Sequence, residues 1–352
     1  MAQPVPYENH LRDRRTERGW SQEKLARRAG LSRAGVSAIE TDRLVPSTAA
    51  ALALAAALGC RVEDLFRLHG EPVAPSWAWA PRREHSRYWA AEVAGAVRLY
   101  PVEPTALGMI DHDGVLRPGA VLEHDREQSR RTLVLACCDP AVGLLAARLA
   151  RLAGVRLLAL PRPSRQALEL LGQQLVHVAG VHLSSASEPE GNGRVVLGAL
   201  GSGFSLLRAA TWEEGIACAA GHGFKSLRAA VRSDVRWIGR EPGSGARQCL
   251  DELLGGRKCA VPCTATDHRG VAEAVKSGWA DAGVCLRLVT EEAGLDFLGI
   301  REEAYDLCFP AGLAEDPRIR ALLEVVRSPD YRKTLAELPG YDSKQTGEIC
   351  QV

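Results

Sequence analysis

The chain has 352 residues, enough for two domains, and with 46% hydrophobic and 25% charged residues its composition excludes a disordered chain. The formal net charge of +1 excludes nucleic-acid binding through bulk positive charge, so any basic surface must be local. The ten cysteines, in a chain whose first residues lack the apolar core of a signal peptide, indicate reduced thiols, and we expect a cytoplasmic protein. The longest apolar stretch, residues 49–58, is too short to span a membrane.

Residues 8–66 have the pattern of short helices separated by capping residues and glycines. Ser21 is the expected N-cap of the second helix, and Gly30 is expected to end it, because glycine adopts the left-handed conformation that follows many helices. Ser32 is the expected N-cap of a third helix, and a fourth is expected to start at Pro46. Two short helices joined by a tight turn that contains glycine predict a helix-turn-helix.

The segments SQEKLARRAGLSRAGVSAIE and PSTAAALALAAALGCRVEDLF resemble the phage-repressor, or Xre/Cro-like, family of DNA-binding domains. The resemblance covers roughly the first 66 residues. In that family the N-terminal end of the third helix enters the major groove of double-stranded DNA. The resemblance therefore implies that the following residues contact an operator: Gln22, Ser32, Arg33, Ala34, Ser37, Ala38 and Arg43.

Arg33 is the best candidate to read a base, because a guanidinium group can bind guanine through two hydrogen bonds. Arg43, just past the same helix, is a candidate phosphate contact. The alternative is that both arginines are solvated surface charges. The domain has only slightly more basic than acidic residues, so one copy would bind DNA weakly, and we expect a homodimer that reads a two-part site.

The segment between the two predicted domains is rich in proline and tryptophan and contains turn signals such as Asp113-Gly114. We expect a linker followed by a few short strands. The sequence thus predicts a DNA-binding domain over 1–68, a linker and β connector over 69–130, and a ligand-binding domain over 131–352.

From residue 131 onward, short apolar runs alternate with helical patterns. The run TLVLACC predicts a buried parallel strand, and VRLLAL, VVLGAL, GIACAA and VRWIG are further strand candidates. Helices are expected after Asp139-Pro140 and from Ser164. Strands that alternate with helices indicate a parallel α/β sheet, in which ligands bind beyond the carboxyl ends of the strands.

Three loops fit such a ligand site, namely residues 137–140, 162–165 and 240–247. The third contains Gly-Ser-Gly ahead of the predicted helix ARQCLDELL. Such a turn can direct backbone N–H groups and a hydroxyl at an anion, and Arg247 would add charge. Most Gly-Ser-Gly turns, however, are only turns.

Five segments resemble the type 2 periplasmic-binding-protein-like domain that is related to molybdate-binding proteins and is also found fused to helix-turn-helix modules. They are RTLVLACCDPA, LLGQQLVHVAGVHL, REPGSGARQCLDELL, DHRGVAEAVKSGWADAGVCLRLVTEEAGLDFLGI and EEAYDLCFP. The resemblance implies two lobes around a cleft, one containing about 131–200 and the chain after about 290, the other lying between. The expected fold is therefore an N-terminal all-α helix-turn-helix domain followed by an α/β two-lobed domain.

By position, the resemblance implies a ligand site composed of Asp139, Ser164, Ser244, Gly245, Arg247, His268, Asp281 and Tyr305. His268 has the alternative of capping a helix, and Asp281 that of capping or pairing. The implied ligand is a small anion such as molybdate, tungstate or a compound related to the molybdenum cofactor. An ionised Asp139 would repel a dianion unless it turns away to cap its helix.

No catalytic residue, metal site or cofactor is predicted. Cys259 and Cys263 lie near His268 in the sequence, but a structural zinc site requires a second pair of ligands at defined spacing. No cysteine lies in a nucleophile motif, and no phosphate-binding or dinucleotide-binding loop occurs. The leading hypothesis is a ligand-responsive regulator. The alternatives are an enzyme tethered to DNA by its N-terminal module and a DNA-bound scaffold that has lost its ligand.

Overall fold

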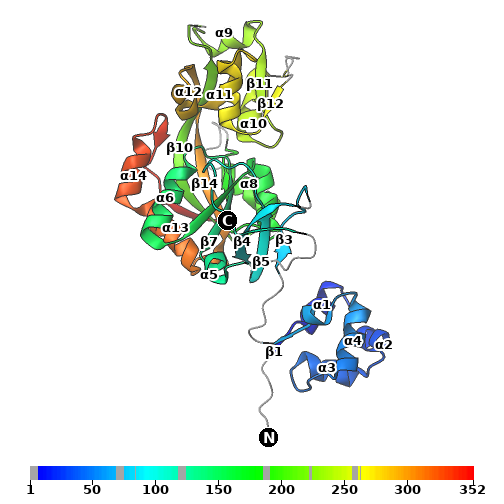
Figure 1. Ribbon diagram of the computed structural model, residues 1–352. Coiled ribbons are helices and arrows are strands. Elements are labelled where there is room, and N and C mark those ends of the chain that lie inside the picture. Colours follow the sequence, from blue (N-terminus) through cyan, green and yellow to red (C-terminus); the bar gives the residue numbers. More distant parts are fainter. Residues whose placement is uncertain are drawn as a thin grey trace. The chain divides into compact units, whose positions relative to one another are not determined.

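The computed structural model describes residues 7–68, 75–83, 85–117, 124–184, 191–221, 224–255, 261 and 263–352. The chain forms two compact units, Met1–Ala74 and Pro75–Val352 (Figure 1). Among the described residues, no helix is both long and apolar enough to cross a membrane.

The first unit is a bundle of short helices. Its elements are β1 (Tyr7–Asn9), α1 (Leu11–Glu17), α2 (Gln22–Ala29), α3 (Arg33–Glu40), α4 (Thr48–Leu58), the 3-10 turn η1 (Val62–Asp64) and β2 (Phe66–Leu68). The expected caps are confirmed: the Ser21 and Ser32 side chains accept hydrogen bonds from backbone N–H groups in the first turns of α2 and α3. Gly30 ends α2 with a φ of +67°. Leu25, from α2, is fully buried in the core of this unit.

The second unit contains one ten-stranded sheet, in which the main strand order is β12-β11-β13-β10-β14-β9-β7-β8. Its strands are β7 (Thr132–Cys137), β8 (Arg156–Pro161), β9 (Val178–Val181), β10 (Phe204–Cys218), β11 (Trp237–Arg240), β12 (Cys263–Ala265), β13 (Ala282–Leu286), β14 (Asp296–Pro310), β15 (Tyr341–Asp342) and β16 (Ile349–Gln351). Its helices are α5 (Arg126–Arg130), α6 (Val142–Ala153), α7 (Ser164–Gly172), α8 (Gly191–Leu200), α9 (Leu227–Arg232), α10 (Gly245–Leu254), α11 (His268–Lys276), α12 (Arg287–Glu292), η2 (Ala311–Leu313), α13 (Pro317–Arg327) and α14 (Pro329–Ala336).

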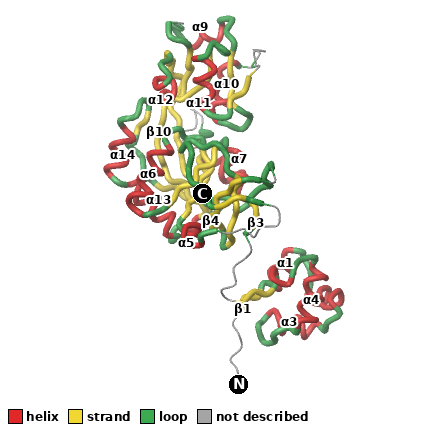
Figure 2. The backbone as a smooth tube through the Cα atoms, viewed as in Figure 1, coloured by secondary structure: helices red, strands yellow, loops and turns green. Residues whose placement is uncertain are grey.

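The strands β10 and β14, of 15 residues each, pair antiparallel and run from one lobe into the other (Figure 2). Lobe one contains β7, β8 and β9 beside the first part of β10 and the last part of β14. Lobe two contains β11, β12 and β13 beside the remaining parts of β10 and β14. The register of the β10–β14 pair shifts between Glu214 and Gly215. A side chain at Gly215 would overlap the backbone of Leu298, so this crossing requires glycine.

The segment VVLGAL, predicted as a strand, is part of helix α8. Val196 is fully buried in one core with Leu168 of helix α7, whereas the next residue, Leu197, is 51% exposed. Burial on one side at helical spacing explains the error, because a short apolar run does not by itself distinguish a strand from a buried helix.

The predicted β connector is part of the second unit from residue 75 onward. Its strands β3 (Ser76–Trp77), β4 (Arg87–Val93), β5 (Ala96–Pro101) and β6 (Gly114–Val115) form a four-stranded sheet. Trp89 and Tyr100 are buried in one core with Val134 of β7 and Leu158 of β8. The large aromatic side chains of this segment are thus buried against lobe one. The boundary predicted at residue 131 therefore runs through a single core. Residues 69–74 lie outside the described residues.

Candidate functional site

The first turn of α3 is the candidate DNA interface. Its N-cap Ser32 accepts a hydrogen bond from the backbone N–H of Gly35 at 3.0 Å. Ser32, Arg33 and Ala34 are exposed, and Ser37 and Ala38 are half-buried. Within the described part of the chain, the Arg33 guanidinium group has no ion-pair or hydrogen-bond partner, so it is available to a ligand such as DNA.

The other two predicted DNA contacts have partners within this unit. Arg43 donates through Nε to the hydroxyl of Thr41 at 3.0 Å and remains exposed. Gln22 donates through Nε2 to Glu40 at 2.8 Å, and the Nε of Arg15 binds the same carboxylate at 2.6 Å. Burial alone would raise the pKa of Glu40, but these hydrogen bonds hold it below its usual value. The negative charge beside the interface is therefore neutralised by Arg15.

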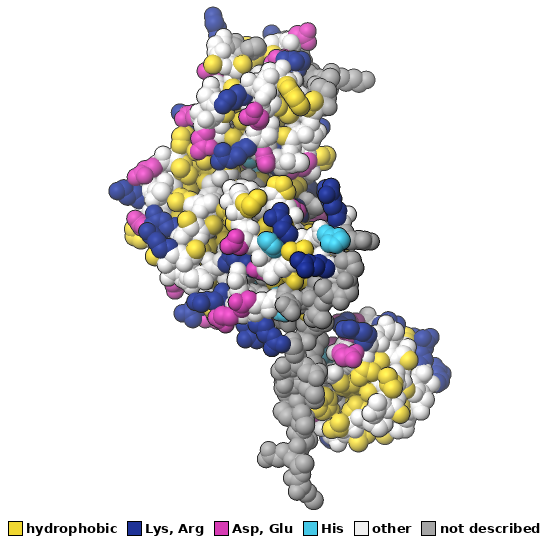
Figure 3. Space-filling model, viewed as in Figure 1, with side chains coloured by type: hydrophobic (Ala, Val, Ile, Leu, Met, Phe, Trp, Pro, Cys, Tyr) yellow, Lys and Arg dark blue, Asp and Glu magenta, His cyan; other side chains and the backbone are white. Residues whose placement is uncertain are grey.

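A basic cluster that the sequence analysis missed surrounds Trp20. The charged groups of Arg18, Lys24 and Arg28 lie 5.6, 5.1 and 4.6 Å from its ring centroid. In the space-filling view, Lys and Arg side chains lie at the edges of this unit, around a face of hydrophobic and other side chains (Figure 3). The sequence signal was a tryptophan flanked by basic residues at the start of α2.

In the second unit, four helices begin directly beyond the carboxyl ends of strands β7, β8, β11 and β12. They are α6 and α7 of lobe one and α10 and α11 of lobe two. Each helix directs the positive end of its dipole toward the cleft between the lobes. The lobes are in contact there, because a Cβ atom on Gly245 would overlap the carbonyl oxygen and ring of His182. The cleft is thus closed in this structure.

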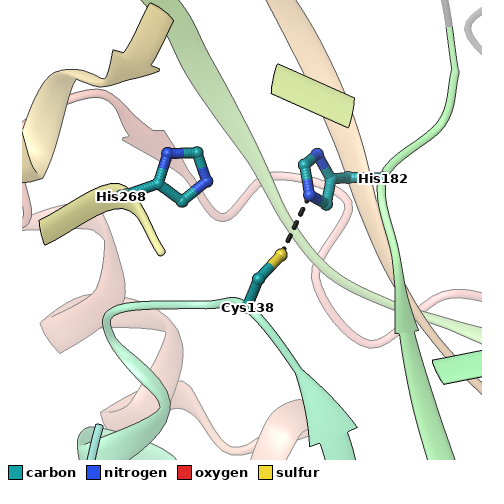
Figure 4. Close-up of side chains that lie close together, drawn as sticks. All are labelled: Cys138, His182 and His268. Carbon is teal, nitrogen blue, oxygen red and sulfur yellow. Dashed lines mark hydrogen bonds between the residues drawn. The ribbon is translucent and has the colours of Figure 1, made fainter. Parts of the chain in front are cut away.

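Three buried side chains, Cys138, His182 and His268, meet at the cleft (Figure 4). The Cys138 Sγ lies 2.9 Å from His182 Nε2. On its other side, His182 Nδ1 lies 3.1 Å from an Oε2 atom of Glu303. His268, the first residue of α11, points toward this pair from lobe two, with its ring centroid 6.2 Å from that of His182.

The two histidines have opposite electrostatic environments. Burial would lower the pKa of His182, but Cys138 and Glu303 raise it well above its usual value. Burial and the nearby Arg240 guanidinium group hold the pKa of His268 well below its usual value, so His268 is neutral. Both ring nitrogens of His268 are buried without a hydrogen-bond partner among the described residues. Such a group is costly to bury unless something binds it.

Buried charged side chains lie next to this cluster. Arg240 is 1% exposed and pairs with Glu241 at 2.7 Å, but its Nη1 atom has no partner in the part of the chain that the structure describes. Arg301 binds Glu303 at 2.5 Å and lies 3.5 Å from Glu214. Burial and the neighbouring charge of Glu303 raise the pKa of Glu214 to about 8.

Several predicted ligand residues lie at the cleft but bind groups of their own chain. Asp139 Oδ1 accepts hydrogen bonds from the backbone N–H of Ala141 at 2.9 Å and from the Tyr341 hydroxyl at 2.8 Å. It therefore turns into its own loop. The Ser164 hydroxyl accepts a hydrogen bond from the backbone N–H of His182 at 3.2 Å.

Two more predicted residues are also buried at this cleft. Ser244 is the N-cap of α10, and its hydroxyl donates to the carbonyl oxygen of Glu241 at 2.9 Å. Tyr305 stacks on Trp212 with ring centroids 4.4 Å apart, which places an aromatic wall beside His182. Ser244 thus directly precedes Gly245, which contacts His182, and Tyr305 packs on Trp212 next to the same histidine.

The last two predicted residues, Asp281 and Arg247, form ion pairs within lobe two. Asp281 binds Arg236 at 2.7 Å and precedes β13, so it lies at the end of the parallel strands opposite the helix N-termini. Asp281 is far from the helix N-termini because it precedes the first residue of β13, although a carboxylate could in principle bind a ligand. Arg247 lies in the first turn of α10, and its Nε atom pairs with Asp251 one turn along the helix at 2.9 Å.

A cavity of about 270 Å³ reaches the cluster. Its walls include Thr105, Cys138, Asp139, Pro161, Asp267 and His268. Sequence reasoning did not name Cys138, His182, Arg240 or Glu303 as site residues. The signal for Cys138 and His182 was present, because both directly follow buried strands at the edge where ligands bind.

Two families match the chain. The family described as PBP superfamily domain matches residues 146–327, and a helix-turn-helix family matches residues 11–65. The protein YvgK of Bacillus subtilis (strain 168), named as uncharacterized, is 32% identical over 184 residues. That match covers 49% of this chain and 58% of YvgK, so it spans less than two thirds of the relative.

The N-terminal unit has a separate relative in the same organism. YgzD of Bacillus subtilis (strain 168), named as an uncharacterized HTH-type transcriptional regulator, is 40% identical over 63 residues, which are 18% of this chain and 96% of YgzD. Among solved structures, a putative phosphate ABC transporter substrate-binding protein from Clostridium perfringens matches with 9% identity and a TM-score of 0.48. That match covers 59% of this chain and 99% of the other.

Proposed function

This chain belongs to the family of the PBP superfamily domain and also carries a helix-turn-helix domain, and on that premise we propose that it is a ligand-responsive, DNA-binding transcriptional regulator. The helix-turn-helix domain binds double-stranded DNA through the first turn of α3. The second unit binds a small molecule in the cleft between its lobes and transmits that event to the DNA-binding unit.

We propose that the ligand is a small anion. The observation that carries this proposal is a pair of buried donors, Arg240 Nη1 and the His268 ring, that have no partner among the described residues. A bound anion would satisfy both, and it would sit at the positive ends of the cleft helices. Asp139 is compatible with an anion because its carboxylate accepts hydrogen bonds from Ala141 and Tyr341. Molybdate, tungstate and compounds related to the molybdenum cofactor are the ligands to test first.

The ligand acts by favouring one arrangement of the lobes. A molecule held by His268 of lobe two and by residues of lobe one binds more tightly when the cleft is closed, and only such differential affinity can shift a conformational equilibrium. One small DNA-binding domain makes few contacts, so the proposal includes a homodimer on a two-part operator, which light scattering of the full chain tests. It also includes a cytoplasmic location, where a regulator meets its DNA.

A thermal-shift screen of the full chain tests the ligand. Molybdate, tungstate, sulfate and phosphate are compared with small organic acids, and bound ligand at one hundred times its dissociation constant should stabilise the protein by about 2.7 kcal/mol. Arg240→Gln should remove the shift, whereas Arg236→Gln, which breaks a surface ion pair with Asp281, should keep it. If no anion stabilises the protein, or if Arg240→Gln keeps the full shift, the anion proposal fails.

One observation favours a second candidate function. Cys138, His182 and Glu303 form a hydrogen-bonded series of the kind that activates a thiol nucleophile. An enzyme of this kind would transfer an acyl group to Cys138 and would be tethered to DNA by its first unit. Mass spectrometry after incubation with p-nitrophenyl acetate would find one acetyl group on Cys138 for an enzyme and none for a sensor.

A further inference from the structure

We propose that Cys138, His182 and His268 bind one divalent transition-metal ion of the zinc class, and that this ion joins the two lobes. Neither the family matches nor the relatives assign such a site. Metal binding itself stands on the geometry below. Its regulatory consequence rests on the proposed function, because an ion that joins the lobes changes DNA binding only if the lobes control the DNA-binding unit.

The three side chains offer one ligand atom each, and these atoms lie within 4.8 Å of one another. Thiolate and imidazole are the preferred ligands of zinc, with bonds of about 2.3 Å to sulfur and 2.0 to 2.1 Å to nitrogen, which place two ligand atoms of a tetrahedron about 3.5 Å apart. The Cys138 Sγ and His182 Nε2 atoms are 2.9 Å apart, so a small outward movement of the two side chains would admit the ion.

His268 is the residue that points to a ligand. It is 1% exposed, it comes from lobe two, and neither ring nitrogen has a hydrogen-bond partner within the described ranges. A thiol–imidazole–carboxylate series for nucleophilic catalysis would need only Cys138, His182 and Glu303. A metal ion explains the fourth side chain as well, because a neutral imidazole aimed at a thiol and a second imidazole completes a three-ligand set.

The supporting residues are those that a metal-bound histidine requires. Glu303 accepts a hydrogen bond from His182 Nδ1 at 3.1 Å, so Nε2, which faces Cys138, is the nitrogen that would bind the ion on losing its proton. Arg301 holds Glu303 in place at 2.5 Å. His182, Glu214 and Glu303 form a second close group of possible ligands. Arg301 pairs with the carboxylates of both Glu214 and Glu303, so we assign this group to positioning His182 and not to metal binding.

The fourth coordination position faces a route to solvent. Cys138 and His268 both line the cavity of about 270 Å³, which gives the ion an entry path. Three protein ligands with one open position are typical of zinc sites that also bind an exogenous molecule. An anion in that position would lie within the field of Arg240, so the metal ion and the proposed anionic ligand are compatible.

The ligands come from both lobes. Cys138 follows β7 and His182 follows β9 in lobe one, whereas His268 begins α11 in lobe two. An ion bound by all three therefore requires the closed cleft, and its binding free energy favours that arrangement.

Cobalt binding to the full chain tests the proposal. Reduced protein is freed of metal with a chelator and titrated with Co²⁺, whose bond to a thiolate gives a charge-transfer absorption band. We expect the band to saturate at one equivalent, to disappear in Cys138→Ser and to require at least tenfold more Co²⁺ in His268→Gln. The control Cys263→Ser, which changes an exposed cysteine, should titrate like the unmodified chain. An unchanged band in Cys138→Ser would overturn the proposal.

A second test of the metal site uses only the unmodified chain, so its result does not depend on whether the variants fold. Zn²⁺ should slow the alkylation of Cys138 by iodoacetamide at least tenfold relative to Mg²⁺, as read from the peptide masses, while the exposed Cys350 is alkylated at the same rate in both. Equal rates at Cys138 overturn the metal site. If the metal site fails while an oxyanion still stabilises the protein, the proposed function stands. If the metal binds but neither ion nor anion changes DNA affinity, the proposed function fails instead.

Discussion

At the scale of single residues, the sequence predicted correctly those features that depend only on adjacent residues. Ser21 and Ser32 cap their helices as expected, because a cap depends on three or four adjacent residues. The ligand site was predicted less well. Asp281 failed because the apolar pattern does not single out the strand that it precedes, and His182 was missed although it follows a buried strand. Its partner Glu303 is 121 residues away in the sequence, and the local sequence pattern cannot predict a contact over that separation.

Two arginines at the DNA interface are expected to behave differently on substitution. Arg33→Ala should remove discrimination at one base position, roughly 1–3 kcal/mol, because its exposed guanidinium group is the candidate base reader. Arg43→Ala should weaken binding to operator and scrambled DNA alike, as expected for a phosphate contact. Fluorescence anisotropy with both DNAs measures this, with Arg61→Ala, which changes an exposed arginine before η1, as the control. An unchanged operator preference in Arg33→Ala would show that the recognition helix is misplaced.

His177 makes the stability of the second unit depend on pH. Its Nδ1 accepts a hydrogen bond from the backbone N–H of Val134, so the ring must be neutral there, and Nε2 lies 2.9 Å from the carbonyl oxygen of Glu92. Burial, with the charge of Arg318, lowers its pKa to about 3. The unfolded pKa is about 6.5, so this stabilisation is complete above pH 6.5 and is lost as pH falls toward 3.

The loss should approach about 1.4 kcal/mol for each pH unit below 6. Urea unfolding at pH 7, 6 and 5 measures it, and the pH dependence of His177→Gln provides the reference, because glutamine does not titrate. The unfolding free energy of the unmodified chain should fall more steeply with decreasing pH than that of His177→Gln. Parallel pH profiles would contradict the assignment.

At the scale of elements, apolar runs predicted the strands β7 and β8 and the helices α6 and α7 of lobe one, because each spans one local repeat. They failed at VVLGAL, where a helix has the same composition as a buried strand. They also recognised only the last part of β10, whose 15 residues change partner and lobe along their length. A strand that passes through two cores does not keep one pattern of alternating buried and exposed residues, so its full length is not visible in the sequence.

The two lobes approach each other closely at Gly245, the first residue of α10. Gly245→Ala should hold the cleft open, because a Cβ atom there would overlap His182. We expect the variant to lose the anion-induced thermal shift while its operator affinity without ligand stays within twofold. Gly198→Ala in α8, where the added Cβ meets nothing within 4 Å, should keep the shift and be slightly more stable. An intact shift in Gly245→Ala would mean that ligand binding does not need the closed cleft.

At the scale of the whole molecule, the two-unit organisation was predicted but the boundary was not. The sequence placed the second domain at residue 131, whereas the second unit starts at Pro75. The difference arises from Trp89 and Tyr100, which pack against β7 and β8. A turn-rich segment with short strands gives no sign of which core it joins, so only its large aromatic side chains could have suggested a buried role.

Truncation tests this boundary. A fragment of residues 75–352 should unfold cooperatively in urea, because it retains the core that Trp89 shares with lobe one. A fragment of residues 131–352 should lack a cooperative transition, since removing that sheet exposes the buried faces of Val134 and Leu158. Equal unfolding midpoints for the two fragments would show that the connector contributes nothing to the core.

The affinity of the full chain for its operator, measured with and without ligand, tests whether this chain is a ligand-responsive regulator. The operator is first selected from random DNA, and binding is then titrated in metal-free buffer, with the best anion of the thermal-shift screen, and with Zn²⁺. We predict that at least one ligand changes the dissociation constant fivefold or more, which is about 1 kcal/mol of coupling, and that residues 1–74 alone show no ligand effect. Identical affinities under all conditions, with ligand bound, would contradict the account of this chain as a ligand-responsive regulator.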